Sequence, residues 1–159
     1  IELVPASMHG ANVRSRLEPH VWKMVCKQVH KSHHRCEVCN QSGLEQGFTH
    51  PVECHEVWRY TSGVQKLQGL QSLCPLCHKC KHMGLAGRQG YQAQALGHFQ
   101  AVNLLSRNQA LHLLKEAEQT AYERSKIHWR LDLTYLNRYP FINDSMTSDE
   151  LKNCKKIEF

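Results

Sequence analysis

Two Cys-x-x-Cys motifs constrain this chain more than any other feature. The first runs from Cys36 to Cys39 and the second from Cys74 to Cys77. Each such turn brings two thiolates to one metal ion, and two turns complete the tetrahedral sulfur shell that is typical of structural zinc. A pair of redox-active dithiols is the alternative, but the sequence around the motifs lacks the strand–helix pattern of a thioredoxin-like site. We therefore expect one Zn²⁺ ion bound by four cysteines.

Composition favours a metal-binding protein inside the cell over a secreted one. The chain has 159 residues, which suits one domain, with 8 Cys and 12 His. No leader of the secretory type opens the sequence, and no apolar run reaches membrane-spanning length, so we expect a cytoplasmic protein without a membrane partner. Lys and Arg exceed the acidic residues by 20 to 14, for a net charge of +6. This excess favours a polyanionic partner without identifying it.

Apolar periodicity predicts helices on both sides of a central segment. We expect a single domain over residues 1–143, with an irregular lead-in over 1–18 and a helix at about 19–34. The core would span 36–84, and the glycine-punctuated residues 85–90 would break the structure. Two helices would follow at 91–103 and 106–126, with Ser106 and Gln109 forming a capping box. Residues 129–136 alternate like a short strand, and residues 144–159 form a polar tail that we expect to be loosely held.

The insert between the two motifs predicts a β-hairpin followed by a helix. Val52, Cys54 and Glu56 alternate with Glu53, His55 and Val57, as in a strand. A turn signal follows at residues 61–63, and a second strand would lead into the second motif. The expected fold is therefore α+β, with a small β-hairpin–α core, a four-cysteine zinc site and flanking helices.

Three histidines indicate a second metal site. His78 and His82 follow the second motif at a spacing of four, which places both on one face of a helix. His55 on the preceding strand is the natural third ligand. Three imidazoles leave coordination positions open, as a catalytic site requires. Solvated surface histidines are the alternative interpretation.

At this point the central segment resembles the HNH endonuclease family, whose core is the ββα-metal fold. The resemblance rests on C-x₂-C, a strand carrying a histidine, L-x-x-L-C and C-x₂-C-H-x₃-H within residues 36–82. Most of the chain is also similar to a standalone bacterial HNH group, in NVRS (Asn12–Ser15), HPVECHEVW (His50–Trp58), LCPLCH (Leu73–His78), KHMGLA (Lys81–Ala86) and RS-x-x-x-W-x-LDL (Arg124 to Leu133).

The resemblance assigns roles to individual positions. His55, His78 and His82 match the family's metal ligands. The position of the general base holds Glu56, and the position of the asparagine that orients the base holds Gly69. Glu56 would then be the base or a fourth metal ligand. A shifted register would instead make His55 the base, and His50 is a further candidate.

The activity implied by the resemblance is metal-dependent hydrolysis of phosphodiester bonds. We expect nucleic acid as the partner, with duplex DNA favoured, and Mn²⁺, Ni²⁺, Mg²⁺ or Zn²⁺ at the histidines. Arg59 would clamp a phosphate and Lys79 and Lys81 would steer the backbone, with Lys66 and Arg88 in weaker versions of that role. Cutting both strands would favour a homodimer. The alternative is a zinc-stabilised nucleic-acid or protein-binding module whose catalytic site has decayed.

Overall fold

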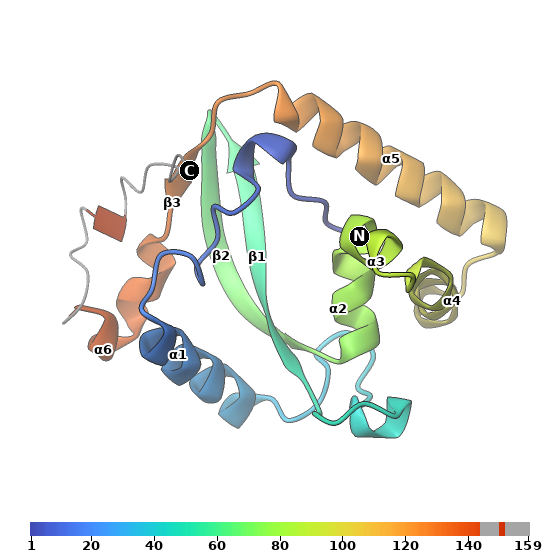
Figure 1. Ribbon diagram of the computed structural model, residues 1–159, viewed down its shortest axis with the longest axis horizontal. Coiled ribbons are helices and arrows are strands. Elements are labelled where there is room, and N and C mark those ends of the chain that lie inside the picture. The colour runs from blue at the N-terminus through green and yellow to red at the C-terminus, as the bar shows by residue number, and fades with distance from the viewer. Residues whose placement is uncertain (144–149, 152–159) are drawn as a thin grey trace.

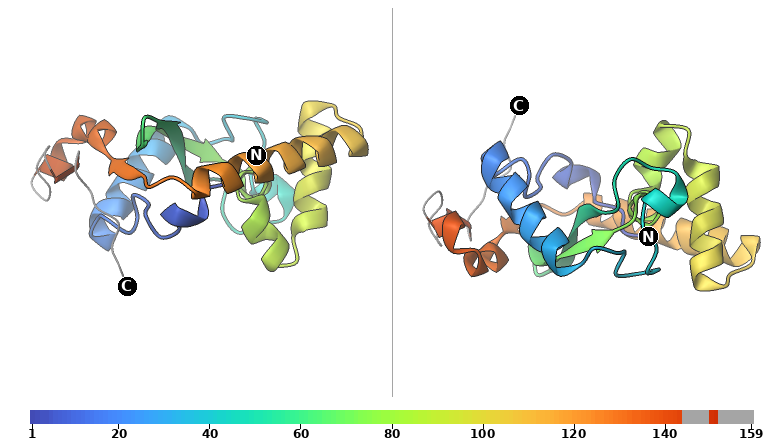
Figure 2. Two further views of the ribbon diagram at one scale, coloured as in Figure 1. Left: turned by 90° about the horizontal axis from the view of Figure 1, so that it is seen from above. Right: turned by 90° about the horizontal axis from the view of Figure 1, so that it is seen from below.

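The computed structural model describes residues 1–143, 150 and 151, and it is an α+β structure with one small sheet (Figure 1). The hairpin strands β1 and β2 run through the middle of the molecule. Helix α1 lies at one end, and helices α4 and α5 extend to the other, which gives an elongated outline (Figure 2). The elements are η1 (Ala6–Met8), α1 (Pro19–Ser32), η2 (Leu44–Gln46), β1 (Glu53–Thr61), β2 (Val64–Leu73), α2 (Pro75–Lys81), α3 (Met83–Arg88), α4 (Gln92–Asn103), α5 (Arg107–Ser125), β3 (Arg130–Asp132), η3 (Thr134–Arg138) and α6 (Pro140–Asn143).

The β-hairpin and the helix after it form where the sequence predicts them. Strands β1 and β2 pair antiparallel from Glu53 opposite Leu73 to Thr61 opposite Val64. Ser62 and Gly63, with φ of 48° and 72°, form the two-residue turn, and paired positive φ angles match the right-handed twist of a hairpin. Helix α2 begins two residues after β2 ends. The chain therefore reverses twice within a short span and brings β1 against α2.

Helix α1 packs its valine stripe onto the main hydrophobic core. Pro19 begins the helix, where its missing N–H costs no hydrogen bond. Val21, Val25 and Val29 are buried at intervals of four residues, which places them on one face. Val21 and Val25 belong to the main core with Leu67 of β2, and α1 lies on the side of the hairpin opposite α4 and α5 (Figure 1).

A second, smaller core joins the helices of the other end. Cys80, Met83, Ala86, Ala95 and Leu114 are buried together and link α2, α3, α4 and α5. The predicted capping box begins α5, with both its hydrogen bonds formed. This core attaches α4 and α5 to the helix that carries two of the predicted metal ligands.

Three segments differ from the sequence-based expectations. Residues 85–88, part of the break expected at 85–90, instead belong to helix α3, because Met83 and Ala86 fall on one buried face and outweigh the low helix propensity of glycine. The strand expected at 129–136 shortens to β3, which pairs parallel with β2, and the chain then turns into η3. Most of the expected loose tail, including Cys154, lies outside the described residues. Leu151, however, is fully buried, and its carbonyl accepts a hydrogen bond from the Leu133 N–H at 2.8 Å.

Among the described residues, none of the helices has the length and hydrophobicity needed to cross a membrane.

Candidate metal centres

The first Cys-x-x-Cys turn is attached by its backbone to the end of β2. Glu37 donates its N–H to the Ser72 carbonyl at 2.9 Å, and its carboxylate accepts the Ser72 N–H at 2.6 Å. The turn closes when the Asn40 N–H bonds to the Cys36 carbonyl at 2.9 Å. These bonds place Cys36 and Cys39 beside the end of β2, just before helix α2 begins.

The second pair of cysteines lies at the N-terminus of α2. Cys74 is the N-cap, its sulfur accepts the Cys77 N–H at 3.4 Å, and Pro75 starts the helix. Gly43 lets the preceding loop approach this turn, since a Cβ there would lie 2.2 Å from the His50 carbonyl oxygen and 2.7 Å from Pro75.

The four cysteines meet in one place, which we call the cysteine cluster (Cys36, Cys39, Cys74 and Cys77). Their sulfur atoms all lie within 4.8 Å of one another, and the sulfurs of Cys39 and Cys74 are 3.5 Å apart. Tetrahedral zinc with Zn–S bonds of about 2.3 Å would separate its sulfurs by about 3.8 Å. The cluster could therefore hold a metal ion such as zinc.

Two side chains from other elements contact the cysteine cluster, and the sequence analysis missed both. Gln46 of η2 donates its side-chain amide to the Cys74 sulfur at 3.2 Å. His98 of α4 places Nε2 3.2 Å from the Cys77 sulfur and 4.0 Å from that of Cys74. Cys80, one turn further along α2, lies outside the cluster and donates its thiol to the Ala95 carbonyl at 3.1 Å.

The three predicted histidines also converge, and we call them the histidine cluster (His55, His78 and His82). One nitrogen from each lies within 4.8 Å of the other two. Their ring centroids are 4.7 to 5.3 Å apart and their planes are steeply inclined, so the rings meet edge to face. His55 comes from β1, His78 from α2 and His82 from the end of α2. The hairpin and the helix therefore bring together the three histidines that the sequence spacing predicted as neighbours.

The electrostatics of the histidine cluster suit a bound cation. His55 is 3% exposed, and its Nδ1 is buried with no hydrogen-bond partner among the described residues. Burial lowers the pKa of His55, and burial together with the neighbouring His78 and His55 lowers the pKa of His82 to about 3. Neutral imidazoles are the form that binds a metal ion. The residues present therefore fit a divalent ion.

Two carboxylates flank the histidine cluster, and neither was predicted as a site residue. Glu53 of β1 hydrogen-bonds to Nδ1 of His78 and, at 2.9 Å, to Nε2 of His50. Burial alone would raise the pKa of Glu53, but these two histidines lower it to about 2. Glu2 lies 3.3 Å from Nε2 of His55 and 3.4 Å from the Lys81 ammonium. Strand alternation from His55 could have found Glu53, whereas no sequence signal points to Glu2.

Glu56 is directed away from the histidine cluster. It follows His55 directly in β1, and neighbouring residues in a strand point to opposite faces. Its carboxylate accepts the Val13 N–H at 2.7 Å and so holds the segment that leads into α1. Burial raises the pKa of Glu56 to about 7. The structure thus brings Glu56 to the NVRS segment rather than to the histidine cluster.

The raised pKa of Glu56 predicts a pH-dependent cost to stability. The folded chain holds the Glu56 proton up to about pH 7, while the unfolded chain releases it near its ordinary pKa of about 4.3. The free energy of unfolding should therefore fall as pH rises through this window. Glu56→Gln keeps an acceptor for the Val13 N–H without the charge. The free energy of unfolding of Glu56→Gln, minus that of the parent, should rise by roughly 3 kcal/mol between pH 4 and pH 8.

Urea unfolding across this pH range measures the effect. The exposed Glu118→Gln on α5 controls for loss of a carboxylate in general. A constant difference between Glu56→Gln and parent at every pH would contradict the buried ionisation. Because Glu56 faces away from the histidines, we also expect this variant to keep its metal-binding capacity.

Gly69 and Arg59 also lie apart from the histidine cluster. A Cβ at Gly69 would have the Tyr135 hydroxyl, at 3.9 Å, as its one neighbour within 4 Å, so an asparagine there would extend toward η3. Arg59 is exposed and lines a separate surface depression with Lys66 and Tyr135. It follows His55 by four strand residues, or about 13 Å. The structure therefore does not bring Arg59 to the predicted phosphate position.

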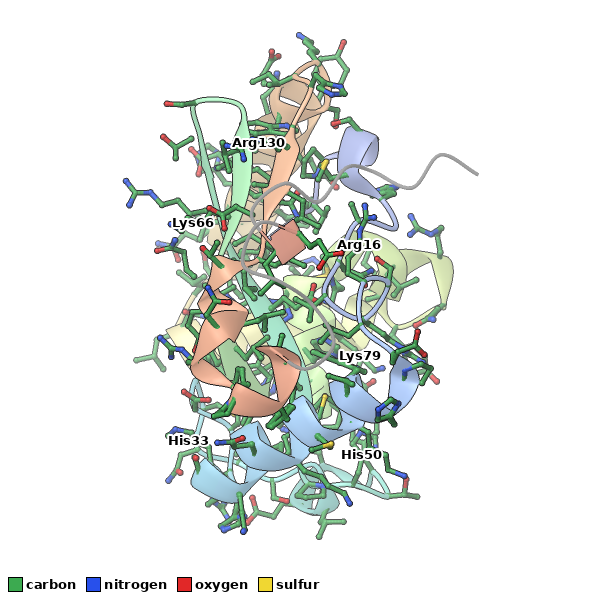
Figure 3. All side chains as sticks on the ribbon, turned by 90° about the vertical axis from the view of Figure 1, so that its left-hand side faces the viewer. Arg16, His33, His50, Lys66, Lys79 and Arg130 are labelled. Atoms are coloured by element: carbon green, nitrogen blue, oxygen red, sulfur yellow. The ribbon has the colours of Figure 1, made fainter. Side chains whose placement is uncertain are left out.

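The predicted basic residues divide between the two ends of the hairpin. Lys79 stacks on the Tyr91 ring at 4.3 Å, and Lys81 pairs with Glu2. Lys66 lies 3.7 Å from Asp132, near the hairpin turn and far from His50 at the other end (Figure 3). Lys79 and Lys81 therefore flank the histidine cluster, whereas Lys66 does not.

Cys54 and Cys26 form a pair away from both clusters. Cys54 is half-buried on β1, and the Cys26 thiol of α1 hydrogen-bonds with it. Neither residue belongs to a group of potential metal ligands among the described residues.

A cavity of about 850 Å³ borders the histidine cluster. The N-terminal segment, the hairpin, α3 and α5 surround it, and His55, His82 and Glu2 lie in its wall. Arg88 of α3 and Arg124 of α5 also line it, as does the other face of β1 at Glu56. The cavity gives a ligand a route to two of the three histidines.

Comparisons with known proteins identify no relatives: no protein-family model matches the chain, and no curated protein or solved structure is significantly similar to it.

Proposed function

We propose that this protein is a metal-dependent endonuclease of the HNH type that hydrolyses phosphodiester bonds in nucleic acid. The observation that carries the proposal is the histidine cluster. Its first member lies on the first strand of a hairpin, the second lies on the helix that follows, and the third is the C-cap of that helix. That order of strand, strand and helix, with histidines at these positions, is what the resemblance to the ββα-metal core implies.

A zinc ion at the cysteine cluster would have a structural role in this proposal. Its four sulfur ligands leave no open position for a substrate, which is the pattern of structural zinc. Cys74 and Cys77 belong to α2, and His78 follows them directly. Zinc would therefore fix the helix that presents His78 and His82 to His55.

The chain's own residues would divide the tasks of hydrolysis. A divalent ion, when bound by the three imidazoles, would supply a Lewis acid for a phosphate oxygen. Glu53 would hold the His78 ring in place through Nδ1, as carboxylates commonly do for metal-binding histidines. Arg88 and Arg124 in the cavity wall offer guanidinium groups to a nucleic-acid backbone.

Glu2 is the carboxylate best placed to accept a proton from the attacking water. It lies in the cavity wall 3.3 Å from Nε2 of His55 and also pairs with Lys81. Glu53 bonds to two histidines, and Glu56, which lines the same cavity, bonds to the Val13 N–H. Burial by itself would raise the pKa of Glu2, but His55 and Lys81 lower it, so the carboxylate is ionised at neutral pH. An ionised carboxylate is the form that accepts a proton.

A zinc-stabilised binding module without catalytic activity is the second candidate. The positions of the family's base and asparagine hold Glu56 and Gly69, and neither faces the histidine cluster. This observation favours a decayed site if Glu2 does not replace the missing base.

A cleavage assay separates the two candidates. Zinc-loaded protein is incubated with plasmid, linear duplex, single-stranded DNA and RNA, each with Mg²⁺, Mn²⁺, Ni²⁺ or extra Zn²⁺. We expect cleavage of at least one substrate that a chelator of the added ion stops. Three imidazoles favour Mn²⁺, Ni²⁺ or Zn²⁺, whereas a carboxylate ligand would favour Mg²⁺. Binding without cleavage under every condition would support the non-catalytic module.

A further inference from the structure

Helix α4 contacts the cysteine cluster through a side chain that the four-cysteine motif does not include. His98 lies with Nε2 3.2 Å from the Cys77 sulfur and 4.0 Å from the Cys74 sulfur. The ring is half-buried between α2 and α4. A metal-bound thiolate has no proton, so this contact is attractive only if Nε2 carries one and donates it.

Two cysteines of the cluster receive N–H groups from three different elements. Cys74 accepts the Gln46 amide of η2 at 3.2 Å and the Cys77 N–H of α2 at 3.4 Å. The Cys77 sulfur lies 3.2 Å from Nε2 of His98 on α4, which would donate to it in the tautomer that carries the proton on Nε2. Four thiolates around Zn²⁺ carry a net charge of −2, and donated N–H groups offset that charge where water is excluded.

His98 also provides one of the polar links between α2 and α4. One turn further along α2, the Cys80 thiol donates to the Ala95 carbonyl of α4 at 3.1 Å. Helix α4 leads into α5, which forms a wall of the cavity beside the histidine cluster. A bond from α4 to the metal site therefore connects the cysteine cluster to that wall.

We propose that His98 is a positioning residue of the zinc site, which donates Nε2–H to the Cys77 thiolate and thereby attaches α4 to the metal. The inference rests on the proposed zinc ion but not on nuclease activity. Zinc occupancy would then hold α4 against α2 as well as ordering the two Cys-x-x-Cys turns. Loss of a hydrogen bond to a ligand commonly costs about 10- to 100-fold in metal affinity.

Four variants of the full chain test this role by zinc affinity and by amide hydrogen exchange. His98→Phe keeps a ring in the α2–α4 interface but has no donor, and His98→Gln keeps an N–H. Gln46→Ala removes an N–H···S bond that comes from outside α4. His112→Ala, whose side chain is 72% exposed on α5, is the histidine control. Zinc affinity is measured by competition with a chromophoric chelator.

We expect His98→Phe to bind zinc about 10- to 100-fold more weakly and to exchange the amides of α4 faster. His98→Gln should recover part of the affinity. Gln46→Ala should weaken zinc binding without changing exchange in α4, and His112→Ala should match the parent. The Co²⁺-substituted parent and His98→Phe should share one absorption spectrum, because the metal keeps its four sulfur ligands.

Three results would overturn the inference. Parent-like zinc affinity and α4 exchange in His98→Phe would show that the contact has no effect on the site. A changed Co²⁺ spectrum in that variant would make His98 a ligand rather than a donor. If the parent protein binds no zinc at all, the proposed zinc site itself is wrong. This result differs from the first because it is measured on the parent chain, not on a variant.

Discussion

Replacing His82 by Ala should abolish nucleic-acid cleavage while leaving the fold intact. His82 offers one of three nitrogens that lie within 4.8 Å of one another, and its loss leaves two imidazoles to hold the ion. Mutation of a group that only orients a metal ligand typically lowers metal affinity or activity about 10- to 100-fold. Removal of the ligand itself should therefore lower the cleavage rate by more than about 100-fold. Calorimetric titration with Mn²⁺ or Ni²⁺ should show that the exchangeable ion no longer binds.

The same experiment needs controls that separate metal binding from catalysis. Zinc content and the circular dichroism spectrum of His82→Ala should match the parent, because His82 lies outside the cysteine cluster. His112→Ala on the exposed side of α5 should cleave like the parent. Cleavage by His82→Ala at the parent rate would exclude the histidine cluster as the active site.

The Glu2→Gln variant tests whether Glu2 is the general base or a metal ligand of this site. If Glu2 accepts the proton, its replacement should slow cleavage by roughly 10² to 10⁴-fold while Mn²⁺ affinity changes little. A large loss of Mn²⁺ affinity would make Glu2 a ligand instead.

Replacing Cys74 by Ser should destabilise the whole protein, and this is the largest effect that we expect on folding. Cys74 is fully buried, caps α2 and shares the cluster with three other cysteines. Serine keeps an oxygen that can cap the helix, so the loss reports on metal binding rather than on capping. Structural zinc contributes on the order of 10 kcal/mol in small zinc domains, which is comparable with the whole stability of a typical domain.

Thermal unfolding and metal analysis measure this loss. Cys74→Ser should retain much less than one zinc ion per chain and should be partly unfolded at 37 °C. Cys26→Ser is the matched control, since Cys26 is half-buried on α1 outside the cluster. It should keep zinc and lose little stability. A Cys74→Ser protein that melts with the parent, or a parent that stays folded in strong chelator without zinc, would contradict a structural zinc site.

Both clusters of potential metal ligands could be predicted from the sequence because short-range spacing decides them. Cys36 with Cys39 and Cys74 with Cys77 are each placed by one turn, and His78 and His82 by one turn of helix. The two-residue turn at Ser62 and Gly63 likewise follows from local backbone preferences. Once the hairpin closes, His55 has few positions available other than one opposite α2.

The role predicted for Glu56 followed the family pattern, although the alternation of side chains along a strand predicts a different position. Alternation along a strand already separates Glu56 from His55, and it places Glu53 on the side of His55. The structure agrees with the alternation. The same rule could have identified Glu53 as the partner of His78.

The sequence by itself thus determined the cysteine cluster, the histidine cluster, the hairpin and the helix that follows it, because each depends largely on residues that are close along the chain. Only the tertiary structure decided which distant groups complete the sites. Glu2 reaches His55 because the N-terminal segment bonds to the backbone of Lys81. His98 reaches Cys77 because α4 packs on α2. Such contacts join residues far apart in sequence, and burial of apolar surface between whole elements brings them together, so no spacing within one element encodes them.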